Sequence, residues 1–236
     1  MKERTRAIFD AAMRSFIATG KPVTSRQLFE RCDFGIKPAM IRWELNALSR
    51  DGFFFQNHPS GGRFPTDKAY RAFIRDILQD QGDVEPTETR EAKALCHDAA
   101  EGEWKDFVTE FAREFQMFSF GYEPARNRTF ESGLSRLINR LDTVARDLLL
   151  EVVGDIENLP DRISEQYLRL IDEDEWPQVF IGSNPFTRSR HVAVVAERFV
   201  TGGGDFFLLT FGPKRMDYEK SLRMLRSIRA ASSRTI

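Results

Sequence analysis

The residues with the clearest chemistry lie in one short turn, HPSGGRFPTDKAY, residues 58–70. A single arginine, Arg63, follows two glycines, and Pro65 and a helix start at Thr66 come directly after it. A guanidinium binds phosphates and fits a narrow, negatively charged groove, and glycines let the backbone come close to a ligand. The turn is therefore a candidate site for contact with a polyanion. The alternative is a solvated arginine that pairs with an acid.

A second group of candidate side chains surrounds a predicted helix that begins at Pro38. Lys37 precedes this helix, where its charge suits a phosphate, and Arg42 has the geometry to bind guanine through two hydrogen bonds. Trp43 either stacks on a sugar-phosphate edge or is a partly buried prop. The other candidate contacts with nucleic acid are Ser25, Arg26, Met40, Asn46, His58, Ser60, Gly61 and Gly62. Of these, His58 is expected to be a hydrogen-bond donor of the turn or a plain surface residue rather than a catalyst.

The elements that must position these residues follow from hydrophobic spacing and capping signals. Two strands, FFFQNH and RFPT, flank the turn and predict a β-hairpin. Three short helices followed by a hairpin are typical of a winged helix-turn-helix, in which the third helix enters the major groove and the hairpin reaches the backbone or minor groove. The helices are expected at about 3–19, from Thr24 or Ser25 to about 32, at 38–51 and at 67–80.

The charge distribution agrees with a nucleic-acid-binding domain at the start of the chain. Residues 1–80 hold 14 Lys or Arg and 9 Asp or Glu, residues 81–180 hold 11 and 23, and residues 181–236 hold 10 and 4. The net charge of -1 therefore hides a basic head and an acidic middle. This asymmetry suggests that the head meets a polyanion and the middle does not.

Beyond the head, a polar stretch at 81–91 predicts a linker, and residues 92–236 predict a second α+β domain. Helical patterns are expected at about 87–118, broken at Gly102, and at 161–175. Segments rich in β-branched and aromatic residues, QVFIG, HVAVVAERFV and DFFLLTFG, predict strands. The turn TGGG joins the last two, and a closing helix is expected at 216–231.

One further helix is expected from Phe130 to Val153, with apolar residues at heptad spacing. We favour a core helix here over a coiled-coil dimer interface, because the seam is short. If the seam does form a dimer, its contacts are Leu134, Ile138, Leu141 and Leu148.

Several function classes have no support in the sequence. The chain lacks a Ser/His/Asp set, a P-loop, a dinucleotide fingerprint and metal-ligand spacing, so no enzyme, metal or cofactor is expected. Cys32 and Cys96 fit no redox or metal motif. No run of about 18 apolar residues exists, and the amphipathic N-terminus carries acids, so neither a membrane span nor a targeting peptide is expected. The expected location is the cytoplasm.

Five segments carry a resemblance to a known family. TGKPVTSRQL (19–28), KPAMIRWELNALSRDGFF (37–54) and HPSGGRFPTDKAYR (58–71) lie in the head, and VFIGSNP (179–185) and GPKRMDYEKSL (212–222) lie near the far end. In this order they resemble the turn, reading helix, wing and C-terminal motifs of the heat-inducible transcription repressors of the HrcA family. The matching positions in the reading helix are Ala39, Ile41, Arg42, Leu48 and Gly52.

The resemblance implies a winged helix-turn-helix followed by a reduced GAF-like α+β domain. It implies a homodimer that binds an inverted repeat upstream of chaperone genes, with activity tuned by a GroE-type chaperonin. Two-fold protein symmetry matches two-fold operator symmetry, which is why a dimer suits an inverted repeat.

The chain departs from the family at three positions of the reading helix and in length. Lys37, Met40 and Trp43 stand where the family has a small hydroxyl residue, Thr and Asn, which leaves the operator sequence open. The shorter middle leaves the mode of dimerisation and the chaperonin contact open. Two alternatives to the repressor remain: a winged-helix regulator of other genes whose GAF-like domain binds a small effector, and a degenerate homologue that has become a protein-interaction module.

Overall fold

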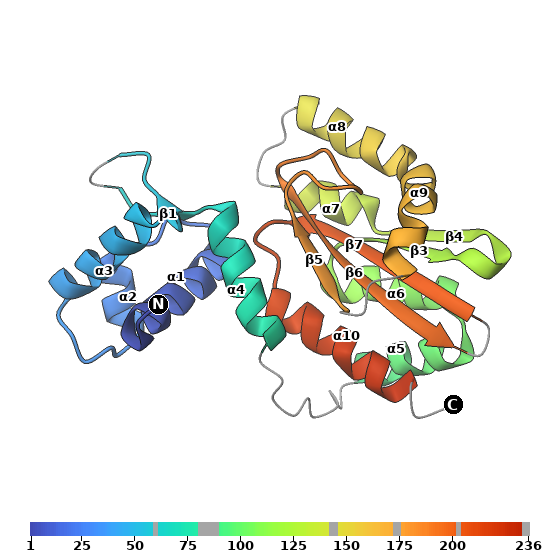
Figure 1. Cartoon of the computed structure of the whole chain (residues 1–236), viewed down its shortest axis with the longest axis horizontal. Coiled ribbons are helices and arrows are strands. Elements are labelled where there is room, and N and C mark those ends of the chain that lie inside the picture. The colour runs from blue at the N-terminus through green and yellow to red at the C-terminus, as the bar shows by residue number, and fades with distance from the viewer. Residues whose placement is uncertain (59–60, 80–89, 142–145, 172–175, 202–203, 233–236) are drawn as a thin grey trace. The chain divides into compact units, whose positions relative to one another are not determined.

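The computed structural model describes residues 1–58, 61–79, 90–141, 146–171, 176–201 and 204–232 of an α+β chain (Figure 1). The chain divides into two compact units. The first unit is Met1–Asp80 with Arg215–Asp217, and the second is Gln81–Lys214 with Tyr218–Ile236. The predicted linker at 81–91 lies almost wholly outside the described residues.

The first unit has four helices and a short hairpin, close to the elements expected from the sequence. Local signals set the boundaries. Gly20 ends the first helix in the left-handed region (φ +66°), and Thr24 and Gln27 form a capping box at the start of the second. Thr66 caps the fourth helix by accepting from Ala69 N. The elements are α1 (Glu3–Thr19), α2 (Ser25–Arg31), α3 (Pro38–Arg50), β1 (Phe54–Phe55), β2 (Phe64–Pro65) and α4 (Asp67–Gln79).

The core of the first unit is built from one apolar stripe on each long helix. Phe9 of α1 lies edge-to-face against Phe53 and Phe54 beside the hairpin, with ring centroids 5.4 and 5.9 Å apart. Such pairs contribute about 0.5–1.5 kcal/mol beyond burial. The other fully buried members include Ile8, Ala12, Met13, Ile41, Leu45, Leu48, Phe73 and Ile74. This packing turns the opposite face of α3 to solvent.

The second unit is built on a five-stranded antiparallel sheet in the order β4-β3-β7-β6-β5. The strands expected from the β-branched runs are present as β5 (Gln178–Ile181), β6 (Val192–Thr201) and β7 (Gly204–Pro213). The sequence interpretation missed β3 (Phe118–Glu123) and β4 (Arg128–Ser132). The TGGG turn includes residues outside the described part of the chain, and Thr201 pairs with Gly204 across it.

Helices cover both faces of this sheet (Figure 1). One face packs on α7 (Leu134–Arg140), α8 (Arg146–Glu157) and α9 (Leu159–Ile171). The other contacts α6 (Trp104–Phe115) and α10 (Tyr218–Ser232), and α5 (Arg90–Glu101) packs on both of those helices. Trp104 stacks face to face on Phe206 of β7 at 3.9 Å. The helical stretch expected at 87–118 is thus two helices, separated at Gly102 as the sequence predicts.

The predicted continuous helix from Phe130 to Val153 is wrong. Its first residues lie in β4, and its remainder is divided between α7 and α8, with residues 142–145 outside the described chain. Leu141 and Leu148 are buried in the core against the sheet, and Leu134 packs on that core. These leucines therefore form no heptad dimer seam, because they fill the interior of their own unit. Ile138 is half-buried.

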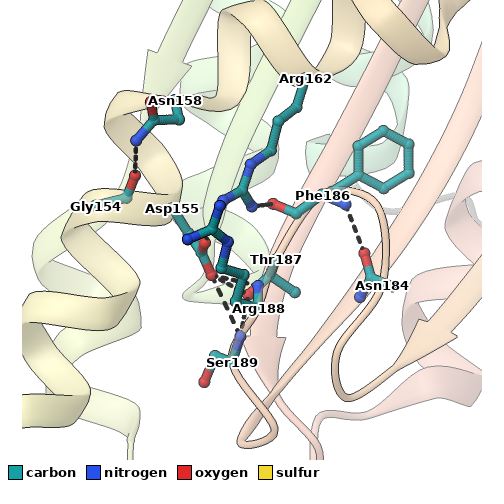
Figure 2. Close-up of polar contacts among 9 residues, drawn as sticks. All are labelled: Gly154, Asp155, Asn158, Arg162, Asn184, Phe186, Thr187, Arg188 and Ser189. Atoms are coloured by element: carbon teal, nitrogen blue, oxygen red, sulfur yellow. Dashed lines mark hydrogen bonds and ion pairs between the residues drawn. The ribbon is translucent and has the colours of Figure 1, made fainter.

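A buried polar cluster ties α8 and α9 to the loop between β5 and β6 (Figure 2). Asp155 of α8 accepts hydrogen bonds from Thr187 Oγ1 at 2.5 Å and from Arg188 N at 2.7 Å. Its other oxygen pairs with Arg162 Nη2 of α9 at 2.8 Å, and Arg162 also donates to the Phe186 carbonyl at 3.0 Å. Both carboxylate oxygens are therefore satisfied inside the unit.

Candidate nucleic-acid interface

The outer face of α3 carries most of the polar and planar side chains that the sequence singles out. Lys37, Arg42 and Asn46 are exposed there. Met40 and Trp43 are 43% and 56% exposed, which is unusual for such large apolar side chains. The face therefore combines two cations, an amide and an exposed indole.

A buried carboxylate that the sequence analysis missed holds α3 against α1. Glu44 is 3% exposed and accepts from Arg4 Nε at 3.1 Å, Arg4 Nη2 at 2.9 Å and Thr5 Oγ1 at 2.9 Å. The acid points inward and is neutralised, so it does not oppose an anion at the outer face of α3. The sequence signal for this burial is the position of Glu44 in the apolar stripe of the helix, one residue before Leu45.

A groove of about 630 Å³ runs between the start of α1 and the length of α3, with lining residues from Ala39 to Asp51. Met40 and Trp43 line one side, and Lys2 and Arg4 line the other. Two acids also line the groove: Glu44, which pairs with Arg4, and Asp51. The apolar surface of Met40 and Trp43 and the ammonium of Lys2 are the parts that suit the sugar and phosphate of a nucleic-acid strand.

The expectation that Arg63 is an exposed fingertip is wrong. Arg63 is only 5% exposed, because it lies in the chain segment that pairs with Val23. Their backbones exchange hydrogen bonds of 2.9 and 2.8 Å. The side chain packs toward α3, where Nη2 donates to Asn46 Oδ1. Burial lowers the pKa of Arg63, and the nearby charge of Arg42 lowers it further.

Two other predicted contacts on α2 are also changed by the structure. Ser25 is 6% exposed at the start of the helix, so burial contradicts its expected contact with DNA. Arg26 is exposed but donates to Glu30 at 2.8 Å, four residues along the same helix. An exposed pair of this kind contributes little to stability and opens readily, so Arg26 stays a candidate contact.

The hairpin turn is exposed in part. His58 and Gly61 are exposed, Gly62 is half-buried, and Ser60 lies outside the described residues. Gly61 N donates to His58 O at 2.9 Å, and Gln56 Nε2 donates to Gly61 O at 2.7 Å. The exposed part of the turn therefore offers backbone and a histidine, with no arginine on it.

Gly62 is expected to tolerate no side chain. A Cβ at this position would lie 2.7 Å from Pro22 Cβ and 2.8 Å from the Pro22 carbonyl oxygen. Gly62→Ala should push the segment away from Pro22, break the Val23–Arg63 pairing and cost about 1–3 kcal/mol. Thermal unfolding and amide exchange at Val23 would measure this. The control is Gly61→Ala, whose closest contact would be 3.2 Å to His58 O; equal effects of both changes would contradict the prediction.

The described residues hold neither a metal-ligating cluster nor a helix that could span a membrane. Within them, no three His, Cys, Asp or Glu side chains are grouped so as to hold a metal ion. Over the same part of the chain, every helix is too short or too polar to cross a membrane.

The similarity to the HrcA family expected from the motifs is confirmed by comparison with curated proteins. The heat-inducible transcription repressor HrcA of Nocardioides sp. is 37% identical over 95 residues, which is 40% of this chain and 27% of that protein. HrcA of Synechococcus sp. is 44% identical over 75 residues, 32% of this chain and 19% of that protein. HrcA of Frankia casuarinae is 27% identical over 173 residues, 73% of this chain and 50% of that protein.

These matches span at most half the length of the relatives. No protein-family profile matches the chain. Among solved structures, a hypothetical protein determined at 2.2 Å resolution superposes with a TM-score of 0.70 and 17% identity, with both chains fully covered. This likeness shows that the fold of the whole chain also exists in another protein.

Proposed function

We propose that this chain is a DNA-binding transcription repressor whose first unit is a winged helix-turn-helix. The observation that carries the proposal is that Arg42 and Trp43 are exposed on α3 and that Lys37 is exposed directly before this helix. The similarity to proteins named heat-inducible transcription repressors supports the same function.

In this proposal α3 lies in the major groove. Arg42 binds a guanine edge through two hydrogen bonds, and Lys37, just before the helix, contacts a phosphate. Met40 and Trp43 cover deoxyribose or a thymine methyl group, and the groove beside them receives the strand near Lys2 and Arg4. The exposed turn at His58 and Gly61 follows the flanking backbone.

The second unit serves in this proposal as a GAF-like domain that holds two DNA-reading units together. The five-stranded antiparallel sheet with helices on both faces supports this assignment. A homodimer would match an inverted repeat, and tethering two readers gains 100-fold or more in affinity. Chaperone genes as targets, a GroE-type chaperonin as helper and a cytoplasmic location are parts of the proposal that rest on the similarity to HrcA.

The test is selection of DNA by the full chain from a randomised duplex library, followed by footprinting upstream of its own gene and of chaperone genes. We expect enrichment of an inverted repeat and protection of that repeat. A chain that folds but enriches no sequence would contradict the proposal.

Arg42→Ala is expected to relax base preference at one position of each half-site, at a cost of about 1–3 kcal/mol. The reason is the loss of a bidentate contact to one base, with the rest of α3 unchanged. Fluorescence anisotropy on the selected duplex and its single base-pair variants would measure it. Arg75→Ala on the exposed side of α4 removes the same charge and should leave the preference intact. Equal, position-independent losses in both variants would exclude base reading by Arg42.

A further inference from the structure

Arg63 is a buried cation whose side chain is committed to one neighbour. Among the residues that the structure describes, no carboxylate lies within ion-pair distance of its guanidinium, and its Nε has no hydrogen-bond partner. The side-chain hydrogen bond that Arg63 does make runs from Nη2 to Asn46 Oδ1 on the outer face of α3. A buried, incompletely paired charge is costly. The presence of Arg63 at this position therefore suggests that its side chain has a function.

The contact fixes which end of the Asn46 amide faces outward. A guanidinium has only donors, so the atom of Asn46 that meets Arg63 must be the carbonyl oxygen. Asn46 itself is exposed. Within the described residues, no protein group accepts from its Nδ2. The NH2 group of Asn46 is therefore available to donate hydrogen bonds to a ligand.

We propose that Arg63 is a positioning residue that makes Asn46 a donor in the major groove, specific for the acceptor edge of guanine. The proposal rests on the DNA-binding function proposed above and assigns one base contact within it. Arg63 itself touches no base in this arrangement.

The base preference follows from the hydrogen-bonding groups that each base pair presents in the major groove of DNA. Reading adenine with asparagine requires Oδ1 to accept from N6 while Nδ2 donates to N7. Arg63 takes one lone pair of Oδ1 and turns this oxygen toward the protein, so the outward NH2 group would meet the NH2 group of adenine donor against donor. Guanine presents two acceptors, N7 and O6, to the same NH2 group. The expected discrimination is roughly 5- to 100-fold at one base pair of each half-site.

The experiment uses the full chain and the duplex that it selects from a randomised library. Dissociation constants are measured for all single base-pair variants with the parent, Asn46→Ala, Arg63→Met and the double variant. Methionine keeps the unbranched apolar stem, removes every donor and leaves no unpaired charge in the interior. We expect both single variants to lose preference at the same G·C pair, and the double variant to lose no more than the larger single loss.

A second readout separates positioning from a phosphate contact. Because Arg63 is buried, Arg63→Met should leave the slope of log affinity against log salt unchanged. Lys37→Met on the exposed surface should reduce that slope by about 1. A reduced slope in Arg63→Met, with a uniform loss across all base-pair variants, would overturn the proposal in favour of a plain charge effect.

Asn46→Asp provides a variant whose folding is not at risk. A carboxylate here would give Arg63 the ion partner it lacks, so the melting temperature of the first unit should rise by about 4 °C or more. The same variant should lose the preference for guanine, because the outward donor is gone. An unchanged or lower melting temperature would show that Arg63 and residue 46 are not in contact.

The two proposals fail in different ways. If the parent selects no sequence, the DNA-binding function fails. If the parent selects a sequence but Arg63→Met keeps the full preference at the pair that Asn46→Ala loses, only the positioning role is overturned. Replacing that guanine by 7-deazaguanine, which lacks the N7 acceptor, should weaken the parent and leave Asn46→Ala unaffected; an equal loss in both would also overturn it.

Discussion

Asp155→Ala is expected to lower the free energy of unfolding of the second unit by about 3–5 kcal/mol. Asp155 is 4% exposed, and the change leaves the Arg162 guanidinium, 16% exposed, with the Phe186 carbonyl as its remaining hydrogen-bond partner in this cluster. The backbone N–H of Arg188 also loses its acceptor. An unpaired buried charge costs more than the ion pair itself contributes, which makes the single replacement severe.

Denaturant unfolding in a Trp43→Phe background would measure this loss. Of the three tryptophans of the chain, that change leaves Trp104 and Trp176, both in the second unit, so the fluorescence reports on that unit alone. Asp155→Asn keeps an acceptor and loses the charge, and it should fall between the parent and Asp155→Ala. Glu157→Ala, exposed on the same helix, is the control. A loss below about 1 kcal/mol would mean that the cluster contributes nothing beyond an ordinary hydrogen bond.

The expected consequence reaches the loop between β5 and β6. Asp155 accepts from Ser189 N at 3.3 Å as well as from Thr187 and Arg188, so three consecutive loop residues depend on one carboxylate (Figure 2). The loop begins in the VFIGSNP segment, one of the motifs that carry the resemblance to HrcA. The anchored residues, Thr187 to Ser189, follow shortly after that motif.

Most of the first unit could be predicted because its signals are local. Three helix boundaries there depend on residues within one turn: Gly20 at the end of α1, the Thr24 capping box and Thr66 before α4. Hydrophobic spacing then fixes which face of α3 is buried and places Arg42 off that face. For Trp43 the spacing leaves two interpretations open, and its 56% exposure favours the first, stacking on a sugar-phosphate edge.

The burial of Arg63 could not be predicted in this way. It depends on pairing with Val23, which is 40 positions earlier in the chain, and on contact with α3. Composition of the turn gives two glycines and an arginine, which is equally compatible with an exposed tip. The buried role of Glu44 could not be predicted for the same reason, because its partners, Arg4 and Thr5, lie on another helix.

In the second unit, the heptad spacing from Phe130 to Val153 predicts one helix, whereas the chain forms the end of β4, then α7, then α8. Leu134, Leu141 and Leu148 do contribute to one apolar core, but Leu134 and Leu141 come from α7 and its C-cap, and Leu148 comes from α8. β3 was missed because every one of its residues is buried, and such a strand lacks the alternation that identifies a half-exposed one. Gly121 allows it to pass close to α6, since a Cβ there would lie 2.8 Å from Val108 Cγ2.

Glu197→Gln is expected to remove a pH dependence from the stability of the second unit. The Glu197 side chain is fully buried on β6, and burial raises its pKa from 4.5 to about 7 despite Arg229 and Arg226 of α10. One oxygen accepts from Arg198 N at 3.1 Å and lies 3.7 Å from Arg229 Nη1. Within the described chain, the other oxygen has no hydrogen-bond partner. The folded state thus favours the neutral acid more strongly than the unfolded chain does.

The sign and size follow from linkage. Because the pKa is higher in the folded state, the stability associated with Glu197 is fully present below about pH 4.5 and is lost as the pH rises through about 7. The loss amounts to about 3 kcal/mol, at about 1.4 kcal/mol per pKa unit. Glutamine stays neutral, so Glu197→Gln should gain on the parent by this amount between pH 4.5 and 8.

Unfolding of both proteins across that range, again followed in the Trp43→Phe background, would measure the difference. Glu131→Gln, exposed on β4, supplies the pH response of a surface replacement. A parent and variant whose stabilities run parallel from pH 4.5 to 8 would mean that Glu197 is ionised in the folded state throughout, with Arg229 close enough to hold it so. A growing advantage of the variant at higher pH would instead establish that β6 carries a carboxylic acid, neutral near pH 6, beneath α10.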